Sequence, residues 1–327
     1  MTMNAKVWMV LALIAAPVFA QVPAPPNSLH IVGTPAVWIS PRSGGAYAAD
    51  FFNLFNAAGQ WPMVKANATA LEVSIQFATT GATDAQFTAM LTALAGDHIG
   101  LGVDFLPLSG VNGCGMNVEG YAAPAQVPWL VARLKRLGAV PLYFGMDEPL
   151  WYGHIYTGAS ACQATTSTLI ADIASKVADI RSVFPAAAIG ETEPLGAVMA
   201  LDPVDRTLPN FTAWLDAFKS ATGTPLAYFR LDMDWTAAWQ PFLAPVAQLL
   251  KSRGIQFQVI YDGQGNAASA AVWAAQVLAN ARAVEAIAAP DVAMFQSWSA
   301  YPTLAEPETN ATTFTGIVKN YLATRAH

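Results

Sequence analysis

Short apolar runs alternate along this chain with longer segments in which apolar side chains recur every three or four residues. Runs of this length, bounded by turn-forming or polar residues, predict strands, and they cover 29–39, 71–77, 99–106, 139–146, 187–191, 226–231, 255–261 and 292–298. The clearest helix is expected over 165–184, where Leu169, Ile173, Val177, Ile180 and Phe184 share one face. Further helices are expected over 45–55, 83–95, 125–137, 211–220, 236–252, 266–288 and 312–324.

These segments form strand–helix units whose strands start roughly 30 to 45 residues apart, the spacing of one βα unit each. Eight such units predict an α/β fold, a (β/α)₈ TIM barrel in a single catalytic domain over 28–327. An open, doubly wound sheet is the alternative. We find no glycine-rich nucleotide-binding motif after the first strand, which favours the barrel.

The first twenty residues are typical of a secretory signal peptide. Lys6 gives a short positive region, 7–16 is apolar, and Val18-Phe19-Ala20 precedes the expected cleavage site. A membrane anchor is the alternative, but the apolar run is short for a bilayer about 30 Å thick. We therefore expect a signal peptide over 1–20, a spacer over 21–27, a secreted or periplasmic protein, and no membrane association after cleavage.

The amino-acid composition limits the classes of partner and cofactor to be expected. The chain has 327 residues, a formal net charge of −6 and no run of Lys or Arg, so nucleic acid is not expected as a partner. Export favours a disulfide between the two cysteines, Cys114 and Cys162, over two free thiols. The four histidines are scattered, and we expect no zinc site and no cofactor. A monomer that acts on a neutral substrate fits these properties.

Carboxylates gather where the expected strands end. Only 12% of the residues are charged, about half the usual share. Even so, seven acids follow strands directly: Asp147, Glu148, Glu191, Glu193, Asp232, Asp234 and Asp262. The carboxyl ends of parallel strands meet on one face of such a fold, the face that carries the chemistry.

Glycoside hydrolysis requires two carboxyl groups, one protonated and one ionised. Glu148 is the strongest candidate for the acid, because the apolar residues Phe144 and Met146 before it and Trp151 after it limit its hydration. Asp147-Glu148-Pro149 at the end of the fourth strand resembles the Asn-Glu-Pro of the large clan of retaining (β/α)₈ glycoside hydrolases. The resemblance implies that Glu148 is the acid/base.

The resemblance extends to Phe295-Gln296-Ser297-Trp298 on the eighth strand, and it implies that Trp298 stacks on the sugar. The chain departs from the clan in having Asp147 in place of Asn. It also has Asp262, not Glu, after the seventh strand, where the clan places its nucleophile.

The partner of Glu148 is left open by the sequence. Glu191 and Asp262 are equal candidates, and Glu193 ranks behind them. Asp147, Glu193, Asp232 and Asp234 are candidate substrate ligands, although an Asp after the sixth strand fits the cap of the next helix equally well. Asp104, within the third strand, is expected to be a buried structural carboxylate.

Aromatic residues near the strand ends complete the expected site, because their faces stack on pyranose rings. These candidates are Trp38, Trp151, Trp235, Tyr261 and Trp298. Together the patterns predict a secreted glycoside hydrolase that acts on a neutral oligo- or polysaccharide. The alternatives are a non-catalytic carbohydrate-binding barrel and a metal-dependent hydrolase that uses the clustered acids.

Overall fold

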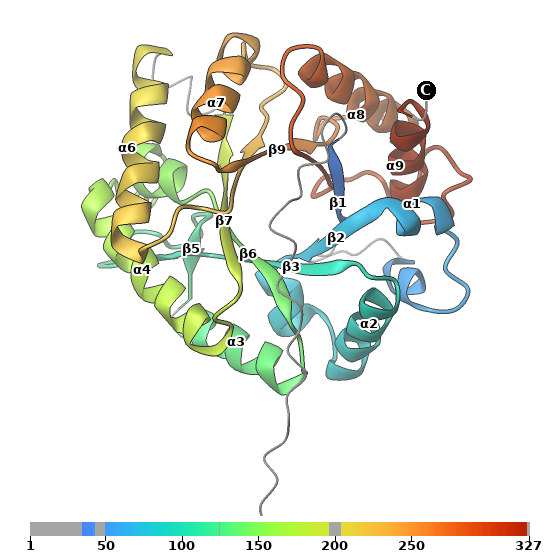
Figure 1. Ribbon diagram of the computed structural model, residues 1–327, viewed down its shortest axis with the longest axis horizontal. Coiled ribbons are helices and arrows are strands. Elements are labelled where there is room, and N and C mark those ends of the chain that lie inside the picture. Colours follow the sequence, from blue (N-terminus) through green and yellow to red (C-terminus); the bar gives the residue numbers. More distant parts are fainter. Residues whose placement is uncertain (1–34, 43–49, 124, 196–203, 326–327) are drawn as a thin grey trace, which may run out of the picture.

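The computed structural model describes residues 35–42, 50–123, 125–195 and 204–325. Within these residues, eight parallel strands close into a barrel in the order β1-β10-β9-β8-β7-β6-β3-β2. They form the central ring in Figure 1, and helices surround them. The strands are β1 Ala36–Ser40, β2 Ala68–Val73, β3 Gly100–Phe105, β6 Pro141–Asp147, β7 Ala188–Pro194, β8 Tyr228–Asp232, β9 Gln256–Tyr261 and β10 Val292–Gln296. The predicted single-domain barrel is confirmed, and the sheet is not open.

The surrounding helices are α1 Pro62–Asn67, α2 Asp84–Gly96, α3 Gln126–Arg136, α4 Thr166–Val183, α6 Val204–Thr222, α7 Gln240–Ser252, α8 Ala270–Glu285 and α9 Phe314–Ala323. Shorter helical turns are η1 Phe51–Phe55, η2 Phe77–Gly81 and η3 Trp151–Ile155. The start of α2 follows from its sequence, because the Thr83 hydroxyl accepts the backbone N–H of Gln86 and the Gln86 side chain accepts that of Thr83. None of the helices in the described ranges has the length and apolar character needed to cross a membrane.

Some predicted boundaries were wrong. Phe77 was expected to end the second strand, but β2 ends at Val73 and Phe77 begins η2. The helix expected from 236 begins at Gln240, because Asp234 and Thr236 form a separate turn before it. The expected signal peptide, spacer and start of the first strand lie outside the described residues.

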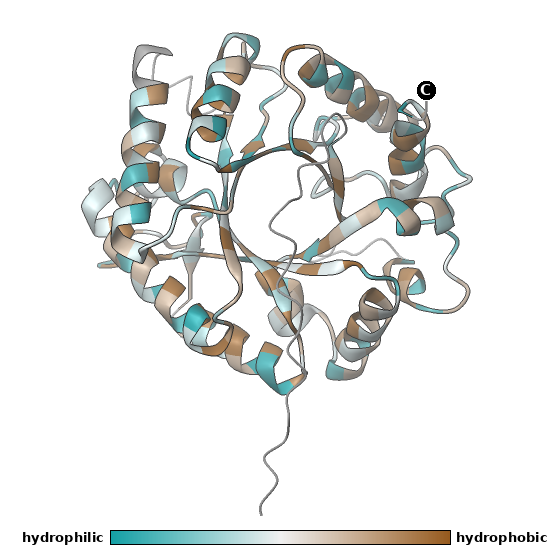
Figure 2. Cartoon of the chain, in the orientation of Figure 1, coloured by the Kyte–Doolittle hydropathy of each residue, from teal (hydrophilic) through white to brown (hydrophobic). Residues whose placement is uncertain are grey.

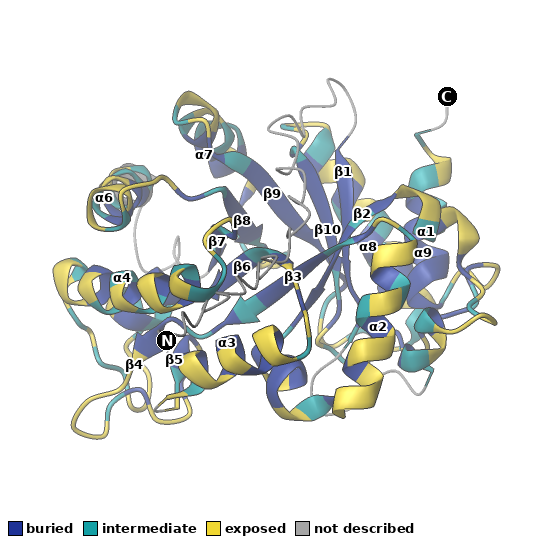
Figure 3. Cartoon of the chain, turned by 60° about the horizontal axis from the view of Figure 1, so that its bottom comes forward, coloured by how far each residue is buried: buried dark blue, intermediate teal, exposed yellow. Residues whose placement is uncertain are grey.

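Helices and strands bury complementary faces. Figure 2 shows that the helices carry both hydrophobic and hydrophilic segments, and Figure 3 shows exposed residues on the helices around a buried set of strands. Outward-facing strand residues such as Ile39, Phe229 and Val259 join the large core between strands and helices. The inward-facing residues Trp38 and Tyr228 pack with Tyr143 inside the barrel. This separation follows from the two-residue period of a strand.

An excursion of the chain between β3 and α3 forms a small two-stranded sheet beside the barrel. After β3, the chain forms β4 Leu108–Ser109 and β5 Tyr121–Ala122, which pair with each other outside the main barrel. The disulfide between Cys114 and Cys162 ties this excursion to the loop after η3, with an S–S distance of 2.07 Å. The predicted pairing is therefore present, and it fixes a wall next to the carboxyl ends of β3 and β6.

Glycine at an inward-facing position makes room for a large interior ring. A Cβ atom on Gly190 of β7 would overlap the ring of Tyr228, which is fully buried. We expect Gly190→Ala to lower the free energy of unfolding by about 2–3 kcal/mol, because the barrel interior cannot absorb the extra atom without moving that ring. Urea unfolding followed by tryptophan fluorescence measures this. The matched control is Gly96→Ala at the end of α2, where an added Cβ meets no atom within 4 Å. Equal stability of the two variants would contradict the prediction.

Candidate functional site

A cavity of about 770 Å³ opens at the carboxyl ends of the barrel strands. The strand residues that line it include Asp104, Asp147, Thr192, Arg230 and Asp232, and the loops add further side chains. Asp104, Asp147, Thr192 and Asp232 are inward-facing residues at or near the last position of their strands, so the barrel register itself gathers them. The disulfide-bonded excursion contributes Asn117, Val118 and Glu119 to the wall.

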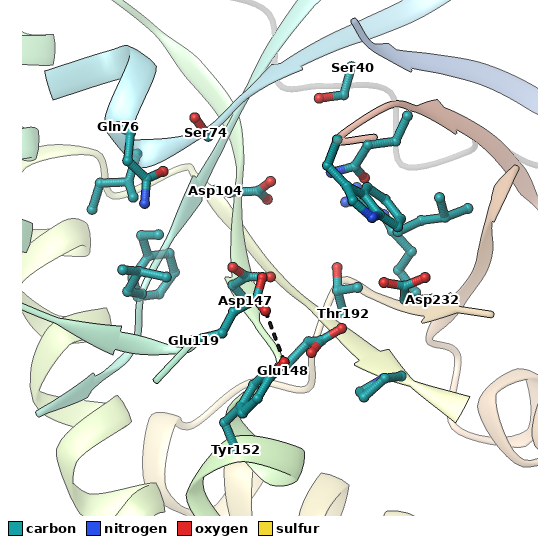
Figure 4. A pocket seen from close by; sticks show the side chains of 18 of the residues that line it. Ser40, Ser74, Gln76, Asp104, Glu119, Asp147, Glu148, Tyr152, Thr192 and Asp232 are labelled. Atoms are coloured by element: carbon teal, nitrogen blue, oxygen red, sulfur yellow. Dashed lines mark hydrogen bonds between the residues drawn. The ribbon is translucent and has the colours of Figure 1, made fainter. Parts of the chain in front are cut away.

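Carboxylates dominate the chemistry of this cavity. Of the described residues, five acids line it: Asp104, Glu119, Asp147, Glu148 and Asp232. Figure 4 shows Glu119, Asp147 and Glu148 close together, Asp232 beyond Thr192, and Asp104 above them. The Tyr152 hydroxyl donates a hydrogen bond to Glu119 Oε2 at 3.0 Å, the dashed line in Figure 4.

Glu148 has an unusual backbone that explains how two consecutive acids reach one cavity. Neighbouring residues of a regular strand face opposite sides, yet Asp147 and Glu148 both line the cavity. Glu148 has φ +46°, in the left-handed region that non-glycine residues avoid. Its N–H donates to the Thr192 carbonyl at 3.1 Å, and its carbonyl accepts the N–H of Tyr152 at 3.0 Å. Backbone strain of this kind is concentrated at functional sites.

Burial and mutual repulsion hold protons on these acids. Burial raises the pKa of Glu148 well above its ordinary value, and the negative charges of Asp232 and Asp147 raise it further. Burial, and then the charge of Glu119, raises the pKa of Asp147 to about 8. Burial raises the pKa of Asp232 to about 7, against a hydrogen bond from Glu148 that lowers it. Asp232 is therefore the acid of these three that ionises first, and Glu148 is its hydrogen-bond donor.

Raised pKa values predict a pH-dependent stability. Folded Asp147 keeps its proton up to about pH 8, whereas the unfolded chain releases it near 3.8. The folded state thus binds the extra proton between these values, and stability is lost as the pH rises through the window. We expect the melting temperature of wild type to fall relative to Asp147→Asn between about pH 4 and pH 8. Parallel melting curves for the two proteins across this window would contradict the assignment.

A buried ion pair forms the floor below the acids. Arg230 donates to both oxygens of Glu72, at 2.6 and 2.8 Å, and to Oε1 of Gln258 at 3.1 Å. Both partners of the ion pair are almost fully buried, with side-chain exposures of 1% and 0%. The guanidinium also lies over the rings of Tyr228 and Trp38, at 4.9 and 5.8 Å from their centroids. Because Arg230 is already paired with Glu72, it offsets the negative charge of the upper acids only in part.

The expected aromatic residues divide into two groups. Trp151 and Trp298 line the cavity, and Trp298 is 49% exposed at its rim. Trp38 lies fully buried inside the barrel below the cavity. Tyr261 faces outward and donates to Glu285, while Trp235 donates its indole N–H to Asp262. Only Trp151 and Trp298 of the five candidates are placed to contact a ligand in the cavity.

Several expected carboxylates lie elsewhere. Glu191 and Glu193 are fully buried on the outer side of β7, where Glu191 accepts the indole N–H of Trp214 at 2.6 Å. Asp234 accepts the backbone N–H and the hydroxyl of Thr236 and so forms a local turn. The alternative, a cap on the next helix, is not formed, because α7 begins at Gln240 without a side-chain cap. Asp262 is bonded to Trp235 at 2.6 Å, and it is not among the described residues that line the cavity. The structure therefore does not bring Glu191 or Asp262 to Glu148 as the sequence suggested.

Two acids that line the cavity, Asp104 and Glu119, were not among the site residues expected from the sequence. Asp104 was expected to be a buried structural carboxylate, and it does share a hydrogen bond with the buried Glu72, but it also lines the cavity. Glu119 lies in an irregular excursion, where no strand pattern marks it. A signal for Asp104 was available in the two-residue period of β3, because Asp104 lies two positions after Gly102, on the same face, one residue before the end of the strand.

Comparison with solved structures supports the barrel. A putative α-L-fucosidase from Bacteroides thetaiotaomicron is 8% identical with a TM-score of 0.54, covering 96% of this chain and 98% of that chain. A GH18 chitinase from Pseudoalteromonas aurantia is 7% identical with a TM-score of 0.50, covering 88% and 99%. An endo-1,4-beta-xylanase from Caldicellulosiruptor owensensis is 8% identical with a TM-score of 0.50, covering 83% and 89%.

This chain shares their barrel. At such low identity the likeness establishes the fold alone. No protein-family model matches the sequence, and a search of curated proteins finds no match. Across the described ranges, no group of three or more His, Cys, Asp or Glu residues is arranged to hold a metal ion.

Proposed function

We propose that this protein is an exported glycoside hydrolase that cleaves a neutral oligo- or polysaccharide, with Glu148 as acid/base and Asp232 as the partner carboxylate. The observation that carries the proposal is that Glu148 and Asp232 line the same cavity, together with Trp151 and the exposed Trp298. The structural likeness to solved chitinase, fucosidase and xylanase barrels supports it. The disulfide supports export, since such bonds persist in oxidising compartments.

The two carboxyl groups have the different protonation states that the reaction needs. Glu148 keeps its proton because its pKa is raised well above the usual value, and it donates that proton to the leaving glycosidic oxygen. Asp232, with a pKa of about 7, ionises first and attacks the anomeric carbon, forming a glycosyl ester. Glu148, now ionised, takes a proton from water, which hydrolyses the ester and restores both groups.

The hydrogen bond between these groups also favours retention of anomeric configuration. An inverting enzyme separates its carboxyl groups by ~6.5–9.5 Å to admit a water, whereas a retaining enzyme holds them ~5–5.5 Å apart. A hydrogen-bonded pair of carboxyl groups is closer to the shorter separation than to the longer one. Trp298, exposed at the rim, and Trp151 offer the apolar faces on which sugar rings stack.

A substrate screen tests the proposal. The purified protein is incubated with neutral polysaccharides, oligosaccharides and aryl glycosides, and released reducing ends are measured. We expect hydrolysis within one substrate class, with the initial product retaining its anomeric configuration by NMR. Binding without turnover on every substrate would replace the proposal with a carbohydrate-binding barrel. An inverted product would remove Asp232 as nucleophile.

A further inference from the structure

Glu193 lies outside the cavity, but its carboxyl group is hydrogen-bonded to the segment that follows Glu148. Its Oε1 accepts the backbone N–H of Leu150 at 2.7 Å, and its Oε2 accepts that of Trp151 at 3.0 Å. These two N–H groups open the helical turn that directly follows Glu148. One buried carboxyl group therefore binds two consecutive donors that would otherwise lack partners in a water-free position.

The same strand holds the segment at a second point. Thr192, the neighbour of Glu193 on β7, accepts the N–H of Glu148. Strand β7 is paired with β6, the strand that ends at Asp147, and the two run side by side in Figure 1. The left-handed conformation of Glu148 is thus fixed from both sides of the residue, because its own N–H and the N–H groups two and three positions later are all bonded to β7. A strained conformation persists only where its surroundings impose it in this way.

Glu191 completes the arrangement. Its Oε1 accepts the indole N–H of Trp214, while its Oε2 is buried, and the Glu193 carboxyl group is the hydrogen-bond partner that remains for it. Glu193 is the adjacent carboxyl group on the same face of β7, and a hydrogen bond links the two side chains. Two touching carboxyl groups in a fully buried place share one proton, since both cannot be ionised. The shared proton satisfies Glu191 and leaves Glu193 bonded to the turn.

We propose that Glu193 is a positioning residue, which holds the 148–151 segment so that the Glu148 carboxyl group faces Asp232 in the cavity. The catalytic consequence of this inference rests on the proposed function. The hydrogen bonds from Leu150 and Trp151 to Glu193 do not depend on that function. It differs from the sequence prediction, which placed Glu193 among the substrate ligands.

Two variants of the same net charge distinguish the hydrogen bonds that Glu193 makes to the turn from the other contacts of the Glu191–Glu193 pair. In Glu193→Gln, the amide nitrogen cannot accept the N–H of Trp151, so one bond to the turn is lost. In Glu191→Gln, the amide donates to the Glu193 carboxyl group, which still accepts both N–H groups. Each variant replaces one buried carboxyl group of the pair by an amide, so the chemical change is matched. If Glu193→Gln does not fold, Glu193→Asp is the second variant. Its side chain is one methylene shorter, so its carboxylate does not reach the N–H groups of Leu150 and Trp151.

Amide hydrogen exchange provides the readout that does not depend on activity. We expect the Leu150 and Trp151 amides to exchange about tenfold faster in Glu193→Gln, and to change by less than about twofold in Glu191→Gln. Unchanged exchange in both Glu193 variants would show that Glu193 does not hold the 148–151 segment. This measurement tests that role even if the wild-type protein hydrolyses no saccharide, in which case the proposed function alone fails.

Kinetics in two backgrounds test the positioning role. We expect Glu193→Gln to lower kcat about tenfold or more with little change in KM, because ground-state contacts to the sugar remain. In a Glu148→Gln background, assayed with an activated aryl glycoside, the same change is expected to have almost no further effect. An equal loss of kcat in both backgrounds would overturn the proposal, since a general loss of folded protein acts regardless of Glu148.

Discussion

Replacing Glu148 by Gln is expected to lower kcat on a polysaccharide or oligosaccharide about 10²–10⁴-fold, the usual contribution of a positioned general acid. The amide has nearly the same size but no proton of suitable acidity to give to the glycosidic oxygen. The loss should be much smaller for an aryl glycoside with a good leaving group, because such a group departs without full protonation. Rates for the two substrate types, measured side by side, give a leaving-group dependence that general unfolding does not produce.

A control for this experiment comes from the outer face of the barrel. Glu191→Gln makes the same chemical change in another buried acid, which the sequence ranked as a catalytic candidate and the structure places against Trp214. We expect its kcat to stay within about threefold of wild type, because its amide oxygen still accepts the indole N–H. Melting temperatures of both variants establish that they are folded in the assay. Full activity of Glu148→Gln on natural substrates, or a comparable loss in Glu191→Gln, would exclude Glu148 as the acid.

Replacing Arg230 by Met is expected to cost about 3–5 kcal/mol of folding free energy, the typical effect of removing one partner from a buried ion pair. Glu72 would remain fully buried, with its two bonds from the guanidinium gone. Gln258 would also lose its donor. Chemical unfolding at constant pH measures the change.

The double variant Glu72→Met/Arg230→Met separates the effect of charge from that of packing. Because it removes both charges and keeps similar volumes, we expect it to recover most of the stability that Arg230→Met loses. If the double variant is as unstable as the single one, the side-chain shapes at the floor of the cavity matter more than the ion pair. Activity is a separate readout, since Arg230 also lines the cavity.

The barrel and part of its site could be predicted from local patterns. Strand and helix periods repeat clearly enough to predict eight units, and the pairing of Cys114 with Cys162 followed from export and their loop positions. Glu148 and Trp298 were expected to share a site, and the structure brings both to one cavity. These features succeed because each depends on residues close in the chain, or on the general rule that parallel strand ends meet.

The direction in which the acids of β7 point was beyond such reasoning. A two-residue period places Glu191 and Glu193 on the same side of the strand, but it does not say which side. The barrel register and the indole of Trp214 on α6 place that side against the helices, and Thr192 faces the cavity instead. Glu191, one of the two expected partners of Glu148, therefore lies away from the cavity, whereas Asp232 lines it.

The sequence by itself determined that eight parallel strands alternate with helices in the barrel, and that Glu148 directly follows the fourth of these strands. Only the tertiary structure decided which carboxyl group lies next to Glu148 and how the floor of the cavity is charged. Glu72 and Arg230 are separated by 158 positions in the chain, and Glu119 comes from an excursion without a regular period. Contacts of this kind depend on how the ring closes and on which face each strand turns inward, and neither is encoded in the spacing of residues along one segment.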